Sequence, residues 1–183
     1  MDDGLLANYR FLARYNAGFN TRLYDACEQL DDATRKQPRG AFFGSIHGTL
    51  NHLLWADTMW LGRFAVQPGV GDPGRGGVYL PSALLALPDG ARHEAVLHED
   101  WAGLREHRRQ LDVAVIAWLD AMAPDAPLQA MFYANTRGVM REHPAWQALT
   151  HFFNHQTHHR GQVTTLLSQA GVDVGVTDLI AWV

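Results

Sequence analysis

The chain has 183 residues and a mass of 20.4 kDa, enough for one domain with a buried core. Its net charge of −4 and its scattered basic residues argue against electrostatic capture of nucleic acid or an anionic membrane. Cys27 is the single cysteine, so no internal disulfide can form, and no apolar run near the start has the length of a signal peptide or a membrane span. We therefore expect a soluble, cytoplasmic protein with a single domain over residues 1–183.

The first two predicted elements are long helices. Apolar residues recur at helical intervals over residues 5–30, and the polar, proline-containing segment 31–40 breaks this pattern. Ser45 has the character of a helix start, and a second apolar pattern runs from there to Phe64 and ends near residues 67–69. A modest loop between two long helices favours an antiparallel pair.

The segment 68–92 differs in composition, because glycine and proline cluster between Pro68 and Gly77. A loop of this length is uncommon in a compact domain. Within it, residues 79–87 are apolar enough that we expect them to pack back on the helices. A third helical pattern is predicted from about Ala91 to Met122.

Residues 128–140 are compatible with a short hairpin that turns at 135–138. The fourth helix is predicted to begin at Pro144, to end near Ala170 and to be followed by Gly171 with positive φ. We expect the tail, 177–183, to form a short apolar turn docked on the helices. The predicted fold class is all-α, an antiparallel four-helix bundle with a long glycine-rich crossover loop.

Four of the ten histidines fall in the predicted fourth helix, and three of them are spaced by four residues: His151, His155 and His159. Side chains four apart lie one above the other on a helix, so His155 and His159 could hold one ion together. Such a pair needs at least one further ligand. His52 on the second helix is the candidate, because Gly48 and Ala56 on its face leave space around it.

Facing helices supply metal ligands in bundles, and three imidazoles with an open position suit zinc, nickel, iron or copper. The alternative is that His52 is an ordinary hydrogen-bonded residue and the pair a chance spacing. Four other histidines lack partners at ligand spacing and are interpreted as solvated, namely His47, His93, His98 and His107. Cys27 is interpreted as a small buried hydrophobe.

Two segments carry a resemblance to a known family: NHQTHHRGQ at 154–162 and FGSIHGTLNHLLWAD at 43–57. Together with Tyr15-Asn16 and residues 169–172 and 177–179, they resemble the DinB family of damage-inducible bacterial proteins. The resemblance implies a four-helix bundle, usually a homodimer, with a divalent metal held by three histidines. His52, His155 and His159 match the ligand positions.

The resemblance also implies a range of functions, since related proteins include transferases and isomerases that use thiols such as bacillithiol or mycothiol. We expect a metal-dependent transferase or hydrolase for a small molecule, with nickel or zinc and a thiol cofactor as candidates. The alternatives are a non-catalytic metal-binding stress-response protein and a bundle whose histidines serve packing alone. No nucleic-acid or membrane partner is expected.

Several neighbours of the candidate ligands have expected roles. Gln162 shares a face with His155 and is a candidate for orienting substrate. His158 is either a proton shuttle or a rim residue, and His151 is either a fourth neighbour of the site or a residue of the helix face. Arg160 is expected to form a structural ion pair with Asp57, and Gly161 to allow close approach of a neighbouring helix.

Overall fold

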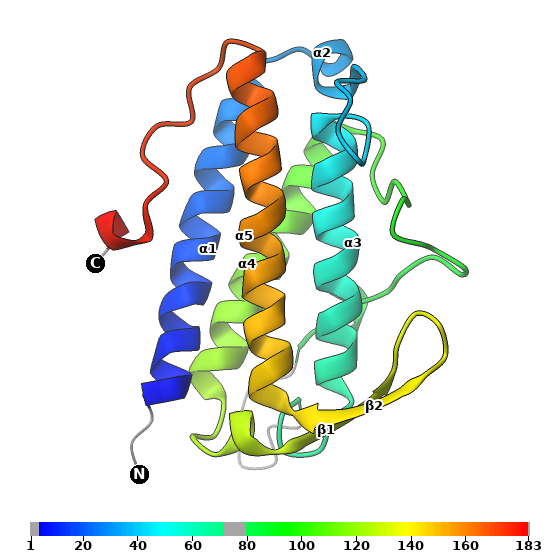
Figure 1. Cartoon of the computed structure of the whole chain (residues 1–183), viewed down its shortest axis with the longest axis vertical. Helices are drawn as coiled ribbons and strands as arrows, with labels where there is room; N and C mark the ends of the chain where they lie inside the picture. The colour runs from blue at the N-terminus through cyan, green and yellow to red at the C-terminus, as the bar shows by residue number, and fades with distance from the viewer. Residues whose placement is uncertain (1–3, 72–79, 183) are drawn as a thin grey trace.

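The computed structural model describes residues 4–71 and 80–182 and is mostly helical, with one small two-stranded sheet (Figure 1). Within these residues the α-helices are α1 (Gly4–Glu28), α2 (Asp32–Lys36), α3 (Ile46–Ala65), α4 (Trp101–Ala121) and α5 (Ala145–Gln169). The strands are β1 (Ala130–Ala134) and β2 (Met140–Pro144), and 3-10 turns lie at Ser82–Leu84, Ala126–Leu128 and Leu179–Trp182. In the described part of the chain, no helix combines the length and apolarity needed to cross a membrane.

The four long helices lie side by side, with α1 and α5 running one way and α3 and α4 the other (Figure 1). The parallel course of α3 and α4 follows from the contact of Phe64 with Trp118 and the ion pair of Asp57 with Arg108. Because α3 and α4 run parallel, the chain has to travel back along the length of α3 before α4 can begin. This return accounts for the long segment between the two helices. The central glycines of this segment, at residues 72–79, lie outside the described residues.

Local signals place three boundaries where the sequence predicted them. The Ser45 side chain caps α3 by accepting a hydrogen bond from the backbone N–H of Gly48 at 3.0 Å. β1 and β2 pair antiparallel across the predicted turn, where Gly138 has a φ of 76°. Helix α5 ends at Gln169, and Gly171 follows with a φ of 79°.

The tail docks on α1 as predicted. Trp182 packs edge-on against Tyr15, with ring centroids 5.8 Å apart, and the Tyr15 hydroxyl donates to the carbonyl of Thr177 at 2.6 Å. Ile180 remains exposed, so only part of the apolar tail contacts the helices.

The predicted start of the third helix at Ala91 was wrong, since α4 begins ten residues later at Trp101. Asp100 caps it, accepting from the N–H of Gly103 at 2.7 Å. The preceding segment lies against α3 instead, where Asn51 Oδ1 accepts the backbone N–H groups of Leu97 and His98 at 2.8 and 2.9 Å. These long-range bonds satisfy backbone groups that a helix would otherwise pair.

The expected ion pair between Arg160 and Asp57 was also wrong. Asp57 is paired with Arg108, which reaches Asp112 as well at 2.8 Å, and all three side chains are buried. The guanidinium of Arg160 instead lies over the aromatic rings of α1, 4.8 Å from the centroid of Phe19.

Candidate metal centre

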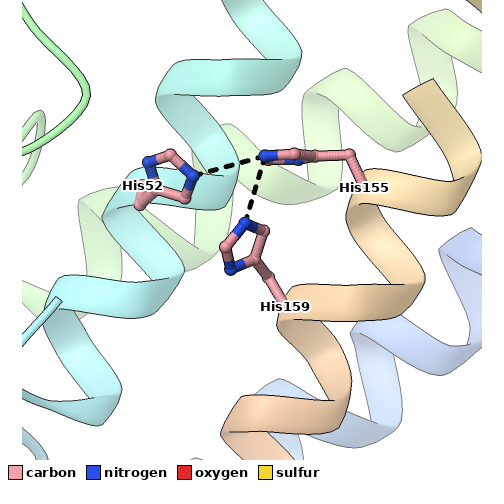
Figure 2. Close-up of side chains that lie close together, drawn as sticks. All are labelled: His52, His155 and His159. Carbon is pink, nitrogen blue, oxygen red and sulfur yellow. Dashed lines mark hydrogen bonds between the residues drawn. The ribbon is translucent and has the colours of Figure 1, made fainter. Parts of the chain in front are cut away.

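Three histidines from two helices face one another (Figure 2). His52 lies in α3, and His155 and His159 lie one turn apart on α5, which runs antiparallel to α3 and packs against it. The four-residue spacing stacks the two α5 imidazoles on the face that meets α3. The structure thus brings together the three residues that the sequence selected.

The distances between the imidazole nitrogens have the scale of a metal site. Nε2 of His155 lies 3.4 Å from Nε2 of His52 and 3.1 Å from Nε2 of His159, and one ring nitrogen of each histidine lies within 4.8 Å of those of the other two. Nitrogens bound to a tetrahedral ion at 2.0–2.1 Å are about 3.3 Å apart. The cluster is therefore compatible with a divalent ion.

Hydrogen bonds at the opposite ring nitrogens set the tautomers of two of these histidines. Nδ1 of His52 lies 2.8 Å from the carbonyl oxygen of His93, and Nδ1 of His159 lies 2.7 Å from Oε1 of Gln162. Both partners are oxygens that can only accept, so each Nδ1 donates and each Nε2 keeps its lone pair. These lone pairs point toward His155, as metal coordination requires.

Burial keeps the imidazoles neutral. It lowers the pKa of His52 to about 4 and the pKa of His155 to about 3, and the neighbouring histidines add to both shifts. Burial also lowers the pKa of His159, against an opposing contribution from its hydrogen bond to Gln162. At neutral pH all three can act as ligands, because metals bind the neutral form of imidazole.

An aromatic side chain that the sequence analysis did not select covers one side of the cluster. The ring of Phe43 stacks on the ring of His52, with centroids 3.7 Å apart, and meets the ring of His159 at 5.5 Å. The loop of Phe43 lies close to α3 because residue 48 is glycine: a Cβ there would lie 2.2 Å from the Phe43 carbonyl oxygen. The space beside Gly48 thus admits this loop, while α5 approaches α3 closely enough to bring His155 to His52.

The other residues that the sequence analysis named as neighbours of the ligands lie around the cluster. His151 is exposed and its ring packs 5.0 Å from the ring of Trp60, so it belongs to the helix face and not to the group of converging nitrogens. His158 is exposed, with its ring edge-on to His159 at 4.7 Å, in a rim position. Gly161 is exposed, with nothing within 4 Å of a Cβ built on it, so no helix passes close there.

The interpretation of the remaining histidines as solvated holds only for His93. His47 is buried, with Nε2 2.8 Å from the carbonyl oxygen of His98, and Nε2 of His98 lies 2.9 Å from Nδ1 of His107. These bonds attach the segment before α4 to α3 and α4. Spacing along one helix could not reveal them, because the partners lie on different elements.

The fold and the cluster together define a mainly helical protein with a group of three histidines able to bind a metal ion. A family model described as DinB family matches residues 3–182, and the chain therefore belongs to the DinB family. A crystal structure of a DinB-like protein from Bacillus cereus is similar in fold, with a TM-score of 0.60, coverage of 96% of each chain and 18% sequence identity. No curated protein sequence matches the chain.

Proposed function

We propose that His52, His155 and His159 bind a divalent metal ion and that the protein is a metal-dependent enzyme acting on a small molecule. The observation that carries this proposal is the convergence of one ring nitrogen from each histidine within 4.8 Å, with Nε2 of His52 and Nε2 of His159 left unprotonated by a hydrogen bond at Nδ1. Convergence of imidazoles from two facing helices is the arrangement by which helix bundles hold metal ions.

The protein groups around the cluster have distinct roles in this proposal. Gln162 and the His93 carbonyl orient two ligands, and Phe43 excludes water from one side of His52. A divalent ion supplies Lewis acidity, by which proteins make water or a thiol nucleophilic at neutral pH. Three protein ligands leave coordination positions for such a molecule.

The reaction class follows from the family resemblance. We propose a thiol-dependent transferase or a hydrolase, with nickel or zinc as the ion and a low-molecular-weight thiol as the co-substrate of the transferase. Three imidazoles bind several first-row ions, so metal availability contributes to the choice.

The test of the reaction is transfer of bacillithiol, mycothiol or glutathione to a chromogenic electrophile, with nickel- or zinc-loaded protein. We expect turnover that chelation abolishes and metal restores, and that His155→Ala lacks. A His151→Ala control should retain activity, because that side chain lies on the helix face. Metal-loaded protein with no thiol transfer and no hydrolysis of ester, amide or phosphoester substrates would contradict the enzyme proposal.

A second candidate is a non-catalytic metal-binding stress-response protein. One observation favours it: in the described part of the chain, no carboxylate forms a hydrogen bond with any of the three histidines. Tight metal binding without turnover in the assay above would support this candidate over the enzyme.

The remaining expectations complete the proposal. We propose a single domain over residues 1–183, built as a four-helix bundle with a glycine-rich crossover, that forms a homodimer in the cytoplasm. Light scattering after size-exclusion chromatography would measure the assembly, and a mass of 20.4 kDa would contradict the dimer.

A further inference from the structure

A groove of about 460 Å³ lies beside the histidine cluster. One wall is the loop before α3, residues 39–42, and the other is the second half of α5, from His158 to Gln169. Gly161 opens the α5 wall, since a Cβ there would meet nothing within 4 Å. The volume suits a small molecule or one end of a larger one.

The groove shares three side chains with the surroundings of the cluster. Gln162 lines it and also accepts the hydrogen bond from His159. His158 lines it with its ring 4.7 Å from that of His159, and Phe42 lines it with its ring 4.8 Å from that of Phe43, which stacks on His52. A molecule in the groove is therefore separated from the cluster by a single layer of side chains.

The charge in the lining of the groove is positive. Arg39 is a permanent cation in its lining, and none of the described lining residues is acidic. Among the residues that the structure describes, Arg39 has no ion pair with a carboxylate, its Nε has no hydrogen-bond partner, and Nη2 makes a single long bond of 3.4 Å to Oε1 of Gln37. A partly buried guanidinium with unused donors favours an anion in its neighbourhood.

We propose that this groove binds the anionic group, a carboxylate or phosphate, of the small molecule processed at the histidine cluster, with Arg39 as its main partner. The planar guanidinium presents paired donors that match the two oxygens of either anion. The proposal rests on the proposed function for the identity of the ligand as substrate, and it extends that function by assigning the substrate class as organic anions.

The test measures binding of inorganic phosphate and of succinate, with neutral succinamide as the comparison, by titration of backbone amide resonances in ¹⁵N-labelled protein. We expect phosphate, succinate or both to shift the amides of Gly161 and Gln162, with succinamide at least tenfold weaker. Arg39→Gln should weaken anion binding at least tenfold, and Arg39→Lys by less. Equal affinity in wild type and Arg39→Gln, equal binding of succinamide, or no anion binding would overturn the proposal.

A second pair of variants tests the groove without changing its charge. Gly161→Leu places a bulky side chain in the open space and should abolish anion binding, whereas Gly161→Ala adds one methyl group and should keep it. Both should retain the wild-type metal content and helical circular dichroism. Undiminished anion binding in folded Gly161→Leu would contradict the assigned location.

Titration of metal-free and metal-loaded protein separates this inference from the proposed function. Arg39 does not depend on the ion, so anion binding should persist without metal. Anion binding in a protein that neither holds metal nor turns over would leave the groove assignment standing and contradict the enzyme proposal. Metal-dependent turnover without anion binding would support the enzyme proposal and contradict the groove assignment.

Discussion

The side-chain oxygen of Gln162 lies 2.7 Å from Nδ1 of His159, one turn along α5. A group that accepts the Nδ1 proton fixes both the tautomer and the ring orientation of the histidine, and it makes Nε2 a better ligand. Gln162 is therefore a positioning residue for the cluster, in addition to its place in the wall of the groove.

We predict that Gln162→Leu weakens metal binding by about 10- to 100-fold, the usual effect of removing such a partner. Gln162→Glu, which keeps an accepting oxygen, should bind metal at least as tightly as wild type. Competition with a chromophoric chelator measures both affinities. Unchanged affinity in Gln162→Leu would show that the hydrogen bond does not support metal binding.

Two helical glycines should respond in opposite directions to alanine. Gly48→Ala places a Cβ 2.2 Å from the Phe43 carbonyl oxygen, so the loop must shift, and we expect a loss of about 1–3 kcal/mol of stability. Gly161→Ala meets nothing within 4 Å and should stabilise the protein by about 0.5–1 kcal/mol. Urea denaturation measures both. Equal effects of the two substitutions would contradict the described packing of the loop on α3.

The buried ion pair predicts a large, pH-dependent loss of stability. Arg108→Met leaves the carboxylates of Asp57 and Asp112 buried without their cation, which should cost about 3–5 kcal/mol at pH 7. Burial already raises the pKa of Asp57 to about 6, so the carboxylate can take up a proton at lower pH.

The loss in Arg108→Met should therefore be smaller at pH 5 than at pH 7, as measured by urea denaturation of variant and wild type. Arg109→Met is the matched control, because Arg109 is exposed and, among the described residues, its ion-pair partner is Glu106 on the same helix at 2.7 Å. It should leave stability nearly unchanged. A similar loss in both variants would contradict the structural role of the buried pair.

Acid should destabilise the metal-free protein through the histidine cluster. The folded-state pKa values of His52 and His155, about 4 and about 3, lie below the value of about 6.5 for an unfolded chain. Below pH 6.5 the unfolded chain therefore takes up protons that the folded protein does not. The contribution of these histidines to the free energy of unfolding is complete above that pH and is lost progressively toward pH 4.

For each such histidine the loss is up to about 1.4 kcal/mol per pH unit. Urea denaturation of metal-free protein between pH 7 and pH 5 measures the slope, and His155→Asn should reduce it by removing one titrating group. The same slope in this variant and in wild type would show that His155 is not held neutral by the fold.

The sequence predicted the helical class, the hairpin and two helix boundaries, because these depend on local signals: apolar periodicity, the cap at Ser45 and the positive φ at Gly171. It also selected the three converging histidines. Spacing identified His155 and His159 as a pair, the small residues Gly48 and Ala56 made His52 the candidate third ligand, and the family resemblance matched all three positions.

The wrong predictions share a physical cause, since each depends on partners far apart in sequence. The segment before α4 has a helical apolar pattern but bonds to Asn51 and His47 of α3. Asp57 pairs with Arg108 of α4, fifty-one residues along the chain, and not with Arg160. Phe43 is near His52 in sequence, but its contact with that ring depends on the fold of the loop before α3, which the glycine at position 48 permits.

The most direct test of the central claim is the metal content of protein purified without a histidine tag, measured by inductively coupled plasma mass spectrometry. We predict about one divalent ion, nickel or zinc, per chain in wild type and in the control His158→Ala, whose side chain lies on the rim. The triple variant His52→Ala, His155→Ala, His159→Ala should hold none while keeping its helical circular dichroism. A full complement of metal in the folded triple variant would contradict the three-histidine site.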